Sequence, residues 1–363
     1  MSARATLPAG SPHGLPDGAA RPGVDVARSS RHRGRVREAR LVAGLSVALV
    51  VLAAVGMTLG DASVPLSGIL DTVLGRADVL TQFVIVELRL PRLLTALVVG
   101  AALGLSGALF QSIVRNPLAS PDIIGITQSA SAAGVLGVVV LGISGLALTG
   151  LVLAGSLVAA VAIYLLAWRG GVAGYRLVLI GIGVAALCMS VVSWVLTTSD
   201  VRDAQAALVW ITGSLARSDW STLNPLLVCF AVLVPLTAYL APRLRSLELG
   251  DDAAAALGIR VERSRLLLIL VAVGLAGSAV AVVGPVAFVA LVAAPIARRT
   301  LADGRLALVP AALVGALLVL GSDLVAQFAI PDVTLPVGVV TGIVGAPYLL
   351  WLLVRTNRSG RGG

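Results

Sequence analysis

The feature that most limits what this chain can fold into is a run of 22 residues, 93–114, without a charged side chain. As an α-helix this run would be about 33 Å long, which matches the roughly 30 Å hydrocarbon core of a bilayer. The segment Arg89-Leu-Pro-Arg92 precedes the run, and Arg115-Asn-Pro-Leu-Ala-Ser-Pro-Asp122 follows it. Because proline suits a helix start and Asn-Pro forces a turn, the pattern predicts a membrane-spanning helix over 93–114.

Similar apolar runs recur along the rest of the chain. Hydrophobic residues make up 58% of the sequence and charged residues 12%, with a mean hydropathy of +1.00. Soluble domains carry about twice that charged fraction. We therefore predict an all-α, polytopic membrane protein of about ten transmembrane helices. The predicted helices cover residues 41–60, 93–114, 123–141, 145–168, 177–197, 223–240, 266–283, 286–297, 306–320 and 337–354.

Residues 266–297 form one uncharged stretch that only Gly284-Pro285 interrupts. We predict two crossings here, because the arginines are then distributed very unevenly. With ten crossings, 22 of the 27 basic residues lie on one side of the membrane. A single crossing would move an arginine-rich loop to the opposite side. Since basic residues gather on the cytoplasmic side, we expect both chain termini in the cytoplasm.

The two ends of the chain differ in composition from the middle. Residues 1–40 are rich in Arg, Pro, Gly and Ser and poor in apolar residues. We predict a disordered, Arg-rich cytoplasmic tail over 1–40, a transmembrane domain over 41–355 and a short cytoplasmic tail over 356–363. A nucleic-acid-binding arm is the less favoured interpretation of the first tail, so no nucleic acid is expected as a partner.

Several classes of activity are disfavoured by what the sequence lacks. All 27 basic residues are arginine, and a Walker A loop needs a lysine, so the chain is not an ordinary P-loop ATPase. Asp, Glu, Arg and His are absent from the interior of the ten runs; Asp323 lies just past the ninth. This disfavours a secondary carrier, which usually holds such groups inside the membrane. With neither a nucleophile–base pair nor a His/Cys/carboxylate cluster in the runs, we expect no catalytic residues, no metal site and no cofactor.

Polar residues inside the runs are mild ones, among which Gln111 and Gln128 stand out. Hydrogen bonding between helices is the first interpretation of such residues. Lining a path for a large, partly polar ligand is the second. Gly100 and Gly104 are four residues apart, a spacing that favours close helix packing. Cys188 and Cys229 lie within apolar runs and are expected to be packed thiols rather than a disulfide.

A loop between the sixth and seventh runs contains a candidate partner-binding segment. Asp251 and Asp252 favour a helix start, the following alanines favour helix, and Gly258 suits the helix end. A short helix with small side chains could lie in a cleft of a partner protein. A solvated surface turn is equally compatible with the residues alone.

These motifs together resemble one family of membrane proteins. The Arg-Leu-Pro-Arg segment, the small-residue run, and Arg-Asn-Pro-Leu-Ala-x-Pro-Asp followed by Gly125 are similar to the FecCD family. Its members are permeases of iron-siderophore and vitamin B12 ABC importers. The resemblance extends from about residue 45 to 355 and includes the segments 210–215, 284–288 and 335–341. Segments 107–112, 165–169 and 261–266 resemble most the second permease subunit of ferric enterobactin importers.

The resemblance implies an activity and a set of partners. It implies a non-catalytic permease subunit in the cytoplasmic (inner) membrane that moves ferric siderophores, with the catecholate type favoured. ATP would be hydrolysed by two separate ATPase subunits, and an extracytoplasmic binding protein would deliver the siderophore. A second permease subunit would complete the path, with a heterodimer favoured over a homodimer. A haem or cobalamin importer is the alternative, and a secondary carrier is less favoured.

The resemblance also implies roles for individual residues. The pair implied for binding-protein docking is Arg89 and Arg92. Positions that correspond to the cytoplasmic gate are Asn116, Leu118, Gly174 and Tyr175. Positions that match the ATPase-coupling pattern Leu-Gly-x-x-x-Ala-x-x-Leu-Gly are Leu249, Gly250, Ala254, Leu257 and Gly258. Gln327 stands where the vitamin B12 permease has a docking arginine, and Gly174 and Tyr175 replace its small hydroxyl residues, which argues against cobalamin.

Overall fold

The computed structural model of the chain describes residues 22–60, 64–169, 171, 174–301, 306–330 and 333–359. The side chains of 22–32, 352–353 and 355–359 are outside this description. The described helices are α1 (Pro22–Thr58), α2 (Leu66–Val73), α3 (Val79–Phe83), η1 (Val84–Arg89), α4 (Leu90–Val114), α5 (Ile126–Val135), η2 (Leu136–Val140), α6 (Gly145–Ala167), α7 (Gly174–Thr198), α8 (Val201–Ile211), α9 (Trp220–Glu248), α10 (Asp251–Ala256), α11 (Val261–Val283), α12 (Val289–Leu301), α13 (Leu308–Phe328) and α14 (Val337–Ser359).

Each of the ten predicted runs corresponds to a helix in the described part of the chain. Seven helical stretches there are long and apolar enough to cross a membrane: Arg33–Thr58, Val79–Val114, Gly145–Ala167, Gly174–Thr198, Trp220–Glu248, Val261–Val283 and Leu308–Phe328. Two shorter apolar helices, Ile126–Val140 and Val337–Trp351, account for two further runs. The remaining run, 286–297, corresponds to α12, which has 13 residues. The prediction of a polytopic all-α membrane protein is confirmed.

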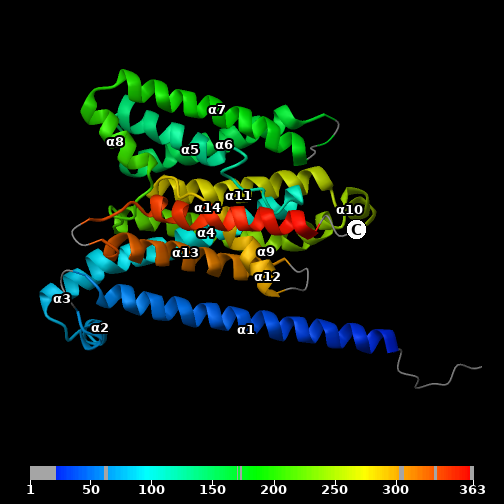
Figure 1. Cartoon of the computed structure of the whole chain (residues 1–363), viewed down its shortest axis with the longest axis horizontal. Helices are drawn as coiled ribbons and strands as arrows, with labels where there is room; N and C mark the ends of the chain where they lie inside the picture. The colour runs from blue at the N-terminus through cyan, green and yellow to red at the C-terminus, as the bar shows by residue number, and fades with distance from the viewer. Residues whose placement is uncertain are drawn as a thin grey trace, which may run out of the picture.

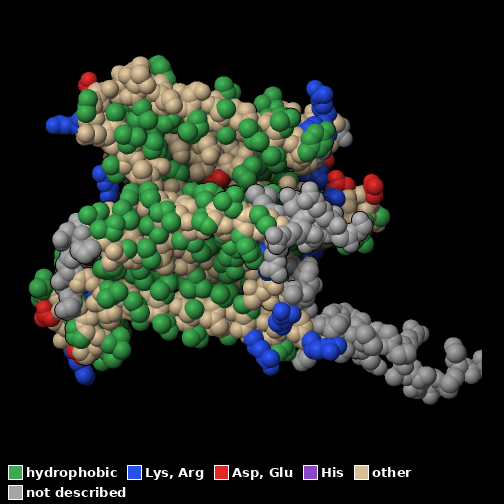
Figure 2. Space-filling view, viewed as in Figure 1, with side chains coloured by type: hydrophobic (Ala, Val, Ile, Leu, Met, Phe, Trp, Pro, Cys, Tyr) green, Lys and Arg blue, Asp and Glu red, His purple; other side chains and the backbone are tan. Residues whose placement is uncertain are grey.

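The helices form a layered bundle with α4 at its centre (Figure 1). On one side lie α5, α6, α7 and α8, and α1 runs along the opposite edge. Within the bundle α4 packs against α13, α11, α12 and α9. The central helices α4 and α11 are mostly buried, whereas few residues in the apolar parts of α1, α6, α7 and α9 are buried within the molecule. Hydrophobic side chains cover much of the face seen in Figure 2, and most charged side chains lie at the two ends. This is the surface expected of a protein whose sides face lipid.

Close packing of α4 against α13 depends on small residues. A Cβ atom at Gly100 would overlap the carbonyl oxygen of Gly315, and one at Gly104 would overlap that of Ala311. Because each glycine has only a hydrogen atom in place of a side chain, the backbones of α4 and α13 are in direct contact. The packing interpretation of Gly100 and Gly104 is therefore confirmed.

The break at Gly284-Pro285 is also confirmed. Helix α11 ends at Val283, Gly284 has a φ of 75°, and α12 begins at Val289. Glycine adopts this backbone conformation without steric cost, and Pro285 has no backbone N–H to donate to a helical hydrogen bond. The uncharged stretch therefore divides into two helices.

Two helices extend beyond their predicted runs. Residues 22–40 are helical and continue directly into the apolar part of α1, and residues 1–21 of the predicted tail lie outside the described residues. Once the apolar part has nucleated a helix, the good helix formers Arg and Glu before it extend it at little cost. The helix predicted over 93–114 also begins earlier than expected. Val79–Val114 is one continuous helical stretch, which includes the π-helical turn η1 just before Pro91. A π turn near a proline accommodates the missing backbone N–H.

Candidate functional site

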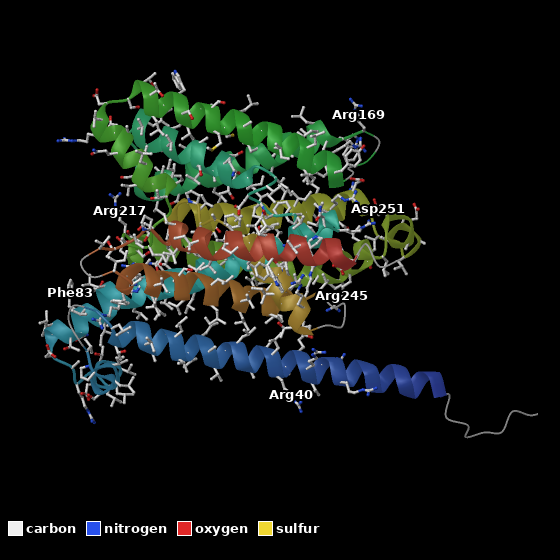
Figure 3. All side chains as sticks on the ribbon, viewed as in Figure 1. Arg40, Phe83, Arg169, Arg217, Arg245 and Asp251 are labelled. Carbon is white, nitrogen blue, oxygen red and sulfur yellow. The ribbon has the colours of Figure 1, made fainter. Side chains whose placement is uncertain are left out.

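Two clusters of charged residues lie at opposite ends of α4. We call them the Arg92 end, where α4 begins, and the Arg115 end, where it stops. In Figure 3, Phe83 and Arg217 lie toward the Arg92 end of the bundle, and Arg245 and Asp251 lie at the Arg115 end. The start of α1 and the end of α14 lie at the Arg115 end as well (Figure 1).

At the Arg92 end, the guanidinium of Arg92 forms a two-point contact with Asp323 of α13. Arg92 Nε donates to Asp323 Oδ2 at 3.0 Å, and Nη2 donates to Oδ1 at 2.8 Å. Gln327 Nε2, one turn further along α13, donates to Oδ2 at 2.8 Å. The side chain of Asp323 is only 3% exposed and that of Arg92 is 22% exposed. Such a bidentate, largely buried pair fixes the relative position of two helices.

The second arginine of this end, Arg89, is the last residue of η1. Its Nη1 donates to the carbonyl oxygen of Met57, near the end of α1, at 2.5 Å. Gly60 has a φ of 139°, and a Cβ there would lie 2.6 Å from Arg89 Nη2. Glycine at position 60 therefore leaves the space that the guanidinium occupies.

A cavity of about 390 Å³ lies between α1, η1, α4 and α13. Its polar lining includes Arg89, Arg92, Asp323 and Gln327, and its apolar lining includes Leu59, Leu88 and Phe328. The cavity thus combines two guanidinium groups with an apolar rim, and it could take up a carboxylate presented by a partner.

This cluster changes the sequence interpretation of Arg92. The sequence suggested two equivalent arginines, but Arg92 is paired within the chain, and α13 continues to Phe328 so that Asp323 is inside a helix. The partners are 231 positions apart in sequence, so their contact could not be predicted from their spacing. The only clue was an acidic residue directly beside an apolar run.

At the Arg115 end, a chain of polar contacts joins four helices. Arg115 Nη2 donates to Asp251 Oδ1, and Arg265 Nη2 donates to the same carboxylate at 2.9 and 2.8 Å. Arg265 Nη1 donates to Glu262 Oε1 at 3.0 Å, and the hydroxyl of Tyr164 donates to Glu262 Oε2 at 2.9 Å. The contacts connect the end of α4 with the start of α10, the start of α11 and the end of α6.

Burial differs sharply within this network. The side chains of Arg115 and Asp251 are 44% and 46% exposed, whereas that of Arg265 is 7% exposed. Burial by itself would raise the pKa of Asp251. The hydrogen bonds and positive charge of Arg265, together with those of Arg115, outweigh burial and hold the pKa of Asp251 below its ordinary value. Asp251 is therefore an anion under physiological conditions.

The segment 249–258 divides into an inward face and an outward face. Ala254 is fully buried and belongs to the main core of the protein. Leu249 and Leu257 are 69% and 62% exposed. Gly250 and Gly258 have φ values of 115° and 79°, which let the chain turn sharply on both sides of α10. The large apolar groups available to a partner are the two leucines, beside the exposed Ala253, Ala255 and Ala256, whereas Ala254 is buried.

The residues expected at a gate lie close to the end of α4. Asn116 is exposed, and its Oδ1 accepts a hydrogen bond from the backbone N–H of Leu118 at 2.9 Å, which stabilises the turn. A Cβ at Gly174 would lie 3.0 Å from a methyl group of Val114. The structure therefore brings the start of α7 against the end of α4. Tyr175, by contrast, is 73% exposed.

Gln111 and Gln128 differ in their surroundings. Gln111 is buried, and its Nε2 donates to the carbonyl oxygen of Leu291 in α12 at 3.0 Å, so it joins two helices. Its Oε1 and that of Gln128 are buried and have no hydrogen-bond partner within the described residues. The contact of Gln111 supports the helix-joining interpretation for that residue. Cys188 and Cys229 are both free thiols.

Comparisons with known proteins agree with this architecture. The FecCD transport family matches residues 48–355. The chain is 42% identical over 312 residues to the ferric enterobactin transport system permease protein FepG of Escherichia coli, covering 86% of this chain and 94% of that protein. It is 36% identical over 330 residues to the permease protein FepD of the same system and organism, covering 90% and 98%.

A solved structure also has the same fold. This structure, an inward-facing conformation of a metal-chelate type ABC transporter, superposes with a TM-score of 0.78 at 30% identity, covering 87% of this chain and 99% of the other. The family match covers most of the sequence, and the relatives match over nearly their full length. The chain belongs to the FecCD transport family.

Proposed function

We propose that this protein is the permease subunit of an ABC importer that moves ferric siderophores across the cytoplasmic membrane. The observation that carries this proposal is the 42% identity to a ferric enterobactin permease over 86% of the chain. A catecholate siderophore is the favoured cargo because FepG and FepD are both named for enterobactin. The permease itself performs no chemistry, and separate ATPase subunits hydrolyse ATP.

The Arg115 end faces the cytoplasm in this proposal. Loops at that end carry most of the arginines of the chain, and basic residues are retained on the cytoplasmic side. The start of α1 and the end of α14 lie at the same end, which supports two cytoplasmic termini. The Arg92 end then faces the compartment from which the cargo arrives.

An ATPase subunit binds the outward face of the segment 249–258. Leu249 and Leu257 are large, apolar and exposed in a loop outside the lipid, and burying them against a partner is favourable. Ala254 supports this contact from behind, since it anchors α10 to the core. A substitution that places arginine at Ala254 would damage the permease itself, so Leu257 is the better position for a test.

A binding protein docks at the Arg92 end, over the cavity that Arg89 and Arg92 line. Arg89 supplies an electrostatic contact beside Arg92, whose guanidinium is paired with Asp323. A carboxylate of the partner would gain orientation and attraction from this site.

A second permease subunit completes the translocation path. The presence of two different relatives named for one enterobactin system in one organism supports a heterodimer. Asn116, Leu118 and Gly174 form the cytoplasmic gate, with Tyr175 beside them, and Gln128 lines the path. Gln111, which joins α4 to α12, contributes through its free Oε1.

Uptake of radiolabelled iron chelates into a deletion strain tests the proposal. Loss of ferric catecholate uptake, with haem and cobalamin uptake unchanged, is the expected result. The deletion strain carrying Leu257→Asp should show the same loss with normal amounts of permease in the membrane. Arg263→Gln is the matched control, because Arg263 is exposed and forms no ion pair among the described residues. Loss of cobalamin or haem uptake alone would contradict the siderophore assignment.

A further inference from the structure

We propose that the Arg115–Asp251–Arg265 network is the mechanical link through which α10 moves the gate segment at the end of α4. This inference rests on the proposed function and adds the residues that transmit the movement. Arg115, Asp251 and Arg265 are therefore positioning residues, which act on the gate without touching the cargo.

The first step is the place of Asp251 in the fold. Asp251 is the first residue of α10, directly after Gly250 with its φ of 115°. Glycine adopts this conformation without steric cost, so the chain can turn sharply from α9 into α10 at that point. Contacts from Arg115 and Arg265 therefore provide the polar attachment of the start of α10.

The second step is the difference between the two arginines. Arg265 is buried, and Glu262 holds its other nitrogen, while Glu262 itself accepts from the hydroxyl of Tyr164. This arginine is fixed to α11 and α6. Arg115 is 44% exposed, and Asp251 is its only ion-pair partner among the described residues. Arg265 therefore resists a displacement of α10, whereas Arg115, which is less firmly held, moves together with Asp251.

The third step is the connection between Arg115 and the gate. Arg115 ends α4 in a left-handed conformation, with φ at 54°, and Asn116 follows it directly. The backbone N–H of Asn116 still donates to the carbonyl oxygen of Gln111 at 3.1 Å. A movement of Asp251 that displaces the side chain of Arg115 would therefore also displace this turn. The turn contains Asn116 and Leu118 and lies near Gly174. Few non-glycine residues adopt this conformation, and the ion pair with Asp251 holds the side chain of the residue at the turn.

The test uses the complete transporter, with both permease subunits and both ATPase subunits, reconstituted in liposomes. Ferric siderophore imported and ATP hydrolysed are measured together, in the presence of the binding protein. Arg115→Asn removes the guanidinium and keeps a residue that tolerates the left-handed conformation. Asp251→Asn removes the carboxylate charge, and Arg115→Lys restores a positive charge.

We expect Arg115→Asn to lower the siderophore imported per ATP hydrolysed by about fivefold, the upper range for an exposed ion pair. Asp251→Asn should lower it by a similar factor, and the double variant should be no worse than the more affected single variant, because both remove the same link. Arg115→Lys should recover part of the loss. The control Arg263→Gln should match the wild type. ATPase subunits should copurify with Arg115→Asn as well as with the wild type.

Three results would overturn the link. They are an unchanged import-to-hydrolysis ratio in Arg115→Asn, losses that multiply in the double variant, and reduced copurification of the ATPase subunits with Arg115→Asn. The last result would place Arg115 in the ATPase interface instead. Failure of the proposed function looks different, because the wild-type transporter would then hydrolyse ATP without importing any ferric siderophore.

Discussion

The two ends of α4 carry the same chemical pair, an arginine and an aspartate, in opposite surroundings. At the Arg92 end the aspartate is 3% exposed and is held by two side chains, Arg92 and Gln327. At the Arg115 end both partners are close to half exposed. A buried pair is costly to break, whereas an exposed pair contributes little to stability. The Arg92 end is therefore built to stay in place, and the Arg115 end can rearrange.

The largest expected effect is at the buried pair. Arg92→Gln removes the counter-charge of Asp323, and leaving a buried charge without its partner costs about 3–5 kcal/mol. We expect a clearly lower midpoint of thermal unfolding in detergent and less permease in the membrane. Arg115→Gln, which removes the same charge from the other end of α4, is the control. Equal unfolding midpoints for the two variants would show that burial does not distinguish the ends.

The next effect concerns Arg89 and the partner at the same end. Arg89→Glu should weaken docking of the cognate binding protein by about 30-fold, the lower range for a charge lost from an interface contact. The single change is cleaner than reversing both arginines, because a glutamate at position 92 would face Asp323. Docking is measured by surface plasmon resonance at low and high salt. Wild-type affinity together with wild-type salt dependence would exclude Arg89 from the docking surface.

A smaller effect is expected for stability at the exposed pair. Arg115→Asn should lower the free energy of unfolding by less than about 1 kcal/mol, because exposed ion pairs contribute only that much. Thermal unfolding in detergent, compared with Arg92→Gln, measures the difference. A loss as large as that of Arg92→Gln would mean that the Arg115 end is as rigid as the other end.

The smallest effect is that of pH. The pKa of Asp251 lies below its ordinary value. Its ion pairs are therefore fully present at any pH above the ordinary carboxyl pKa, and they are lost only as pH falls through the lowered pKa. Between about pH 5 and 8, therefore, the ratio of coupled transport in the wild type to that in Asp251→Asn should be constant. A ratio that falls toward pH 5 would indicate that Asp251 takes up a proton in that range.

Features that depend on residues close together in the sequence could be predicted without the structure. The ten apolar runs, the break at Gly284 and the close packing at Gly100 and Gly104 each depend on residues near one another in the chain. The family was recognisable for the same reason, because its motifs are short and contiguous. The π turn before Pro91 was not, since a helix continuing past a proline depends on the contacts around it.

Features that depend on distant pairs were not accessible. Asp323 lies next to an apolar run, but its burial and its pairing with Arg92 depend on the register between α4 and α13. Ala254 was expected to face a partner, yet packing of α10 against the core turns it inward. Arg115 and Asp251 stood out separately in the sequence, and only the fold brings the end of α4 beside the start of α10.

The direct backbone contact between α4 and α13 limits how this protein can change shape. Gly100 and Gly104 allow no space between these helices, and Arg92 and Asp323 hold them at one end. Sliding or rotation of one helix against the other would drive backbone atoms into each other, so the two form one rigid body. A transport cycle must therefore be carried by hinges outside this pair, in segments such as the turns around α10 and the break between α11 and α12. The centre of the permease would then act as a fixed frame around which the remaining helices open and close.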